Sequence, residues 1–160
     1  MHNRANMEKT LIHPILGTVE LEAHNQSWWT TTQVLPIAGL GFSGRISTFS
    51  PGGPPPERQL EAMIQALSVT PELRREMVER MALEYAETDF YGEGIPELRT
   101  PEDIWSRFME LTVFVSDGRS IGEDNDEMIT TYAFRLAADP DHEINVECRR
   151  GQIVDVRCEG

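Results

Sequence analysis

The sequence contains few of the residues that usually indicate a catalytic or metal-binding site. Its 160 residues include two cysteines and four histidines, and the histidines form neither a helical i, i+4 pair nor an H-E-x-x-H motif. A P-loop and a G-x-S-x-G elbow are also missing. We therefore expect no catalytic, cofactor-binding or metal-binding residues from local motifs. An enzyme whose carboxylates meet only in space would leave no such motif and stays an alternative.

Long hydrophobic runs are missing too. No segment approaches the about 20 apolar residues that cross a bilayer, and residues 1–7 lack the apolar core of a signal peptide. We expect a cytoplasmic protein without membrane contacts. Hydrophobic residues make up 39% of the chain and charged residues 26%, which is typical of a globular domain that folds without disulfide or metal.

Positive charge is scarce: 14 Lys and Arg stand against 27 Asp and Glu, a formal net charge of −13. The excess lies after residue 56, because residues 1–56 hold three residues of each sign. Such a field repels nucleic-acid backbones and attracts basic protein surfaces. We expect no nucleic-acid partner and favour a basic protein, while solubility alone is the alternative role of the charge.

The first half of the chain predicts strands followed by helices. Apolar and polar residues alternate in 15–22, and residues 27–35 are rich in Trp, Thr and Val, both of which are typical of half-buried strands. Residues 42–49 are a third candidate strand. Residues 50–56 are rich in proline and glycine and end this pattern. Helical spacing begins at Glu57, and Thr-Pro-Glu start signals at Thr70 and Thr100 predict two further helices.

The last third of the chain returns to a period of two. Residues 111–115, 128–136, 144–148 and 154–158 predict an antiparallel meander. The fold class is therefore α+β, a mostly antiparallel sheet with two to three helices packed on one face. We expect residues 1–14 to form a flexible N-terminal extension and residues 15–160 to form a single domain.

The register of the last hairpin separates the two cysteines. If the apolar faces agree, Cys148 faces Val154 and Cys158 faces Ile144. The sulfurs then lie roughly 13 Å apart at ~3.3 Å per residue, whereas a disulfide needs Cα atoms within about 7 Å. Both cysteines are predicted to be free thiols.

A glycine-rich segment matches a nucleotide-binding pattern without its context. Gly39, Gly41 and Gly44 fit G-x-G-x-x-G, but that motif needs a helix to begin within it. Here the chain continues toward residue 49 as a predicted strand. We interpret the segment as a bend between strands.

Acidic residues and adjacent tryptophans are the candidate partner-binding residues. Acids cluster in residues 123–127 and 139–143, which we expect in loops that project charge. Trp28 and Trp29 are consecutive in a strand, so their side chains point to opposite faces and only one can join a given core. The other is either covered by a helix or by the N-terminus, or exposed as an anchor for a partner. The candidate contacts are Trp28, Trp29, Asp124, Asp126, Asp139, Asp141, His142 and Glu143.

The order of these features resembles a family of small acidic bacterial proteins, a domain of unknown function that is immunity-protein-like. The resemblance covers residues 17–156 and rests on Tyr91-Gly92, Pro96-Glu97, Pro101-Glu102-Asp103-Ile104 and the hairpin at residues 138–146. In the family this hairpin reads W-D-P-E-H-G-L-G-V, and Ala138, Glu143 and Asn145 depart from it. The resemblance implies no catalytic residue.

The leading hypothesis is a non-enzymatic protein-binding module, in the form of an immunity-like inhibitor of a basic toxin. The alternatives are an enzyme with a site assembled across the sheet and a structural subunit.

Overall fold

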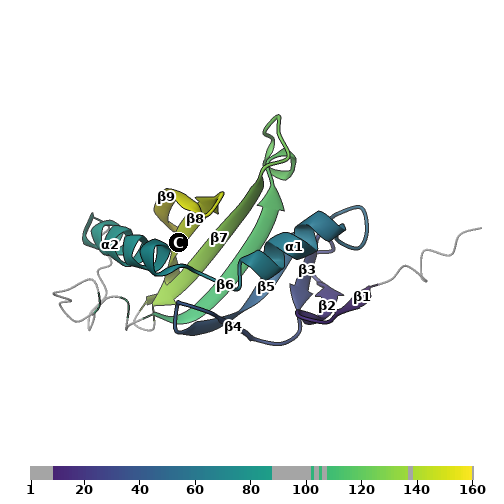
Figure 1. Ribbon diagram of the computed structural model, residues 1–160, viewed down its shortest axis with the longest axis horizontal. Coiled ribbons are helices and arrows are strands. Elements are labelled where there is room, and N and C mark those ends of the chain that lie inside the picture. Colours follow the sequence, from purple (N-terminus) through teal and green to yellow (C-terminus); the bar gives the residue numbers. More distant parts are fainter. Residues whose placement is uncertain (1–8, 88–101, 103–104, 106–107, 137–138, 160) are drawn as a thin grey trace, which may run out of the picture.

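The computed structural model describes residues 9–87, 102, 105, 108–136 and 139–159 (Figure 1). The strands are β1 (Thr10–His13), β2 (Gly17–Leu21), β3 (Trp28–Thr31), β4 (Leu35–Ile37), β5 (Phe42–Phe49), β6 (Phe108–Asp117), β7 (Met128–Leu136), β8 (Asp139–Arg149) and β9 (Gln152–Glu159). The helices are α1 (Glu57–Gln65), α2 (Pro71–Glu87) and the short 3-10 helix η2 (Arg119–Ile121).

The nine strands form one sheet in the order β1-β2-β3-β5-β6-β7-β8-β9, and β4 pairs with β5 beside β3. Every pairing is antiparallel except that of β5 with β6. Those two strands can be parallel because the chain between them includes α1 and α2, a connection long enough to return to the same end of the sheet. The predicted α+β class with a large, mostly antiparallel sheet is confirmed.

Both helices are tied to the sheet by side-chain hydrogen bonds. Gln59 of α1 donates to Thr48 Oγ1 at 2.9 Å. The predicted start of α2 is confirmed, because Thr70 Oγ1 accepts a hydrogen bond from the backbone N–H of Leu73 at 3.1 Å. Farther along α2, Glu84 accepts the backbone N–H of Cys158 at 3.1 Å. This contact covers part of the edge of β9, where an unpaired backbone group could otherwise bind another strand.

The third predicted helix falls largely outside the described residues. Only Glu102 and Trp105 are described there, and both have helical backbone conformation. Trp105 is buried and packs edge-on against Phe42 at a ring distance of 5.2 Å. Arg74 of α2 lies 5.2 Å from the Trp105 ring and binds Glu102, so this part of the chain is held against the start of α2.

The hydrophobic core follows from alternation along the strands. Ile46, Val113, Tyr132 and Val146 occupy one row across β5 to β8 and are all buried. Trp29 of β3 is 0% exposed and belongs to the same core. Residues one step along each strand point to the opposite face of the sheet.

The sheet begins earlier than the sequence predicted. Residues 10–13, which we expected in the N-terminal extension, pair with residues 17–20 as β1 and β2. The turn between them is stabilised by His13, whose Nδ1 accepts the backbone N–H of Ile15 at 3.0 Å.

The C-terminal hairpin confirms one predicted pairing and corrects another. Ile144 faces Cys158 as predicted, but Cys148 faces Ile153 instead of Val154, because a bulge follows Glu147. The turn itself holds Arg150 and Gly151 at φ values of 55° and 73°, as a two-residue hairpin with a type I′ turn requires. As a result Val154 is 48% exposed and Ile153 is buried. Neither Cys148 nor Cys158 forms a disulfide.

The glycine-rich segment is a bend between β4 and β5, as predicted. Gly39 has φ +89°, and a Cβ there would lie 2.0 Å from the carbonyl oxygen of Val69. Its neighbour Ala38 exchanges backbone hydrogen bonds with Leu67 and Val69 at 2.7 and 2.8 Å. The missing side chain thus lets the connection between the helices approach the sheet.

Candidate functional site

The face of the sheet opposite Trp29 carries polar and aromatic side chains, and we call it the open face. By alternation it includes Trp28, Thr30, Ser47, Thr112 and Phe114. Two hydrogen bonds place α1 on the other face: Gln59 donates to Thr48, and Tyr132 donates to the carbonyl oxygen of Ala66, which follows α1. The open face is therefore the side on which the sheet itself supplies the surface.

Three aromatic rings cluster on the open face. Trp28 lies directly opposite Phe49 in the register, with ring centroids 5.4 Å apart, and lies 5.5 Å from Phe114. Both contacts are edge-to-face, the arrangement that aromatic quadrupoles favour. All three side chains are half-buried. We call Trp28, Phe49 and Phe114 the aromatic cluster.

A groove of about 420 Å³ lies beside this cluster. Its lining residues are Glu22, Thr30, Val34, Ser43, Gly44, Arg45, Ser47, Glu110, Leu111, Thr112 and Phe114. Thr30 donates its hydroxyl proton to Glu22 Oε1 at 2.6 Å, and Ser47 Oγ lies 2.8 Å from the same hydroxyl. The side chains of Glu22 and Arg45 make no ion pair among the described residues, whereas Glu110 pairs with Arg135 at 3.5 Å.

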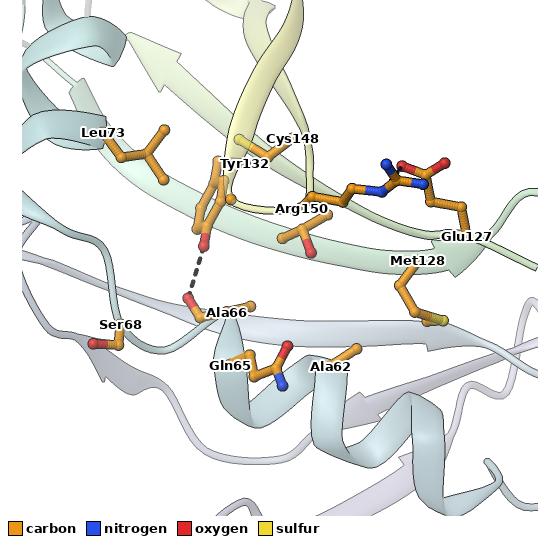
Figure 2. Close-up of a pocket in the computed structure, with 12 residues that line it drawn as sticks. Ala62, Gln65, Ala66, Ser68, Leu73, Glu127, Met128, Tyr132, Cys148 and Arg150 are labelled. Carbon is orange, nitrogen blue, oxygen red and sulfur yellow. Dashed lines mark hydrogen bonds and ion pairs between the residues drawn. The ribbon is translucent and has the colours of Figure 1, made fainter.

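A second hollow, of about 300 Å³, lies between the two helices and β7 and β8 (Figure 2). Tyr132 points across it and donates to the carbonyl oxygen of Ala66 at 2.9 Å, and the Cys148 side chain lies near the ring. Arg150 and Glu127 form an ion pair at 3.4 Å on the rim. We call this hollow the helix-side pocket.

The thiol and the phenol of the helix-side pocket are poorly suited to act as a nucleophile or a base near neutral pH. Burial, together with the carboxylates of Glu76 and Glu147, raises the pKa of the Cys148 thiol to about 12. Burial also raises the pKa of Tyr132 above its ordinary value. Both groups therefore stay protonated, whereas a thiolate nucleophile or a general base needs a pKa near or below the working pH.

The acidic loop predicted to project charge is largely paired within the chain. Arg58 and Arg119 both contact Asp126, the former through an ion pair of 3.9 Å. Glu123 accepts two hydrogen bonds from Arg149, at 2.7 and 2.6 Å. These bonds are the main reason that the pKa of Glu123 falls to about 2. Asp124 is exposed and has no such partner among the described residues.

The second acidic cluster does not lie in a turn. β8 begins at Asp139, which pairs with Leu136, so Asp139, Asp141 and His142 belong to a strand. Their side chains lie outside the described part of the structure. Glu143 is half-buried and lies 3.9 Å from Arg135.

The two acidic clusters lie at opposite ends of the meander. Met128 and Leu136 bound β7, and the eight residue steps between them span roughly 26 Å at ~3.3 Å per residue. The loop at residues 123–127 adjoins the first end and residues 139–143 adjoin the other. The structure therefore does not bring these candidate contacts into one site.

The tryptophan pair is divided as alternation predicted, and Trp29 is the core member. Because Trp29 is fully buried, it is unavailable to a partner, and Trp28 is the one on the open face. Sequence reasoning missed Phe49, Phe114 and Glu22. Phe49 and Phe114 lie in two separate predicted strands. Only the parallel pairing of β5 with β6 brings the two rings close together.

No protein-family model matches the chain, and neither the curated proteins nor the solved structures provide a match. Within the described residues, no helix is long and apolar enough to cross a membrane. The same residues contain no group of three or more His, Cys, Asp or Glu side chains placed to hold a metal ion.

Proposed function

We propose that this chain is a non-enzymatic protein-binding module, and that it docks a basic protein partner on the open face of its sheet. The observation that carries the proposal is the aromatic cluster of Trp28, Phe49 and Phe114 beside the groove. In a sheet, aromatic residues usually join the core, and half-buried rings beside a groove are typical of binding anchors. The hydrogen bonds of Gln59 and Tyr132 hold α1 against the opposite face, which leaves this one for a partner.

The negative net charge of the chain indicates that its partner has a basic surface. A net charge of −13 attracts a basic surface at long range and speeds association, while contacts at the aromatic cluster slow dissociation. The proposed setting is the cytoplasm, where free thiols stay reduced. An immunity-like inhibitor of a basic toxin is the specific form that this proposal takes.

The open face replaces the acidic loops as the main docking surface in this proposal. Asp126 and Glu123 already bind arginines of the chain, so a partner would have to compete for them. Asp124 has no such partner among the described residues and contributes to steering. The enzyme alternative is weaker, because the thiol and phenol of the helix-side pocket stay protonated near neutral pH.

The test is affinity capture from the source cell on three immobilised proteins: wild type, Trp28→Ala and the control Leu83→Ala. Leu83 is 63% exposed on α2 and lies outside the groove lining. We expect a basic protein that the wild type and the Leu83 variant retain at low salt, that high salt releases, and that Trp28→Ala loses. The proposal would be contradicted if Trp28→Ala retained the same basic protein as the wild type, or if no basic protein bound at low salt.

A further inference from the structure

We infer that the groove beside the aromatic cluster receives a cationic side chain, arginine or lysine, from the partner. Glu22 supplies the carboxylate, Ser47 and Thr30 supply the polar floor, and Phe114 supplies an aromatic wall. This inference rests on the proposed function and specifies its central contact.

The directions of the hydrogen bonds in the floor select a donor-rich ligand. Thr30 has a single hydroxyl proton and donates it to Glu22 at 2.6 Å. Its 2.8 Å contact with Ser47 must then be donated by Ser47, which uses that side chain's only proton. Ser47 Oγ and the second oxygen of Glu22 are left with lone pairs alone. The floor is therefore a row of acceptors, complementary to an ammonium or guanidinium group.

Charge and aromatic geometry favour a cation over a neutral donor. Glu22 is half-buried and makes no ion pair among the residues that the structure describes. Among those residues its carboxylate accepts a hydrogen bond only from the neutral Thr30 hydroxyl, so its negative charge remains for an incoming cation. The Phe114 ring lines the same groove, and Trp28 packs against that ring at 5.5 Å. Aromatic faces attract cations within about 6 Å, and arginine more often than lysine.

Among the described residues that line the groove, Arg45 is the one with a cationic side chain. It lies on β5, two residues from Ser47, and is exposed. Its charge opposes a bound cation, so its removal should strengthen binding, whereas an anionic ligand would be weakened by the same change. Arg45→Gln therefore distinguishes the two ligand charges directly.

The experiment titrates the protein with an acetylated, amidated Gly-Ser-Arg-Ser-Gly peptide and with its citrulline counterpart, which keeps the shape but lacks the charge. Binding is followed by NMR at the Trp28 indole N–H and the Thr30 amide. We expect the arginine peptide to bind about tenfold or more tightly than the citrulline peptide, and Glu22→Gln to abolish most of that preference. The matched control is Glu72→Gln, which makes the same charge change at an exposed position on α2.

The outcomes separate this inference from the proposed function. Equal binding of the two peptides, equal effects of Glu22→Gln and Glu72→Gln, or weaker binding by Arg45→Gln would overturn the cation site. Even if the cation site were wrong, capture of a basic partner that depends on Trp28 would still support the proposed function. Conversely, arginine-selective binding without any captured protein would support the cation site and contradict the proposed function.

Discussion

The two faces of the sheet place neighbouring tryptophans in different surroundings. Trp29 is fully buried among core residues, whereas Trp28, the next residue in the chain, is half-buried and contacts two phenylalanines on the open face. The polar groups differ in the same way: the Tyr132 hydroxyl on the helix side binds a backbone carbonyl, and the hydroxyls on the open face form a chain that ends at a carboxylate. One face therefore packs against α1 and stabilises the fold, and the other is the face that we propose for contacts with a partner.

Substitution of the two tryptophans should give the largest difference in the free energy of unfolding. Trp29→Ala should lower the free energy of unfolding by about 3–5 kcal/mol, because it removes a fully buried ring and leaves a cavity. Trp28→Ala should lower it by only about 1–2 kcal/mol, the value of partial burial and two aromatic contacts. Urea denaturation of the two variants provides the measurement. Similar losses would mean that the open face is as much a part of the core as the helix side.

Much of this division could be predicted from alternation alone. Consecutive tryptophans in a strand must point to opposite faces, and β5 occupies the same residues as its predicted strand. The start of α2 was also readable, because Thr70 followed by Pro71 is a local signal that needs no tertiary contact. Such features depend on residues close together in the chain.

Other features depend on long-range pairing and could not be predicted in this way. The bulge after Glu147 shifts β9 by one residue and exposes Val154. Four arginines pair with the acidic loop, and they come from separate elements: Arg58 on α1, Arg119 in η2, Arg149 at the end of β8 and Arg150 in the turn that follows. The groove joins Glu22 to Ser47 across β3. Charge counting along the sequence cannot reveal which acids are already paired.

The next contrast concerns how the helix side is attached to the sheet. Gly39→Ala should cost more than about 2 kcal/mol, because its Cβ would meet the Val69 carbonyl at 2.0 Å and its φ is +89°. Gly41→Ala is the matched control, with φ +76° and no atom within 4 Å of the added Cβ. It should cost only about 1–2 kcal/mol from the left-handed backbone. Equal melting temperatures for the two variants would show that the connection between the helices moves freely away from β4.

Hydroxyl deletions on the two faces provide a finer test. Tyr132→Phe leaves the Ala66 carbonyl in a buried site without its donor, and we expect a loss of about 1–2 kcal/mol in urea denaturation. Thr30→Val removes a half-buried hydroxyl that binds the half-buried Glu22 carboxylate and the buried Ser47 hydroxyl. Because water can replace the donor to Glu22, we expect a loss of less than about 1 kcal/mol, smaller than that of Tyr132→Phe. The same Thr30 variant should bind the arginine peptide less tightly. If Thr30→Val lost more stability than Tyr132→Phe, the open face would contribute more to the stability of the fold than the helix side, contrary to our assignment.

The smallest expected effect is the pH dependence of the ion pair that joins the acidic loop to β8. Arg149, with help from Asn125, lowers the pKa of Glu123 from 4.5 to about 2. Because the pKa is lower in the folded state, the pair contributes its full stability above about pH 4.5 and loses it as the pH falls toward about 2. Urea midpoints of the wild type, Glu123→Gln, Arg149→Met and the double variant, measured at pH 6 and pH 2, isolate the coupling between the two side chains. It should be present at pH 6 and nearly absent at pH 2, and it should stay small because the carboxylate is exposed to solvent screening. A coupling that is equal at both pH values would mean that contacts other than the charge pair hold the acidic loop against the sheet.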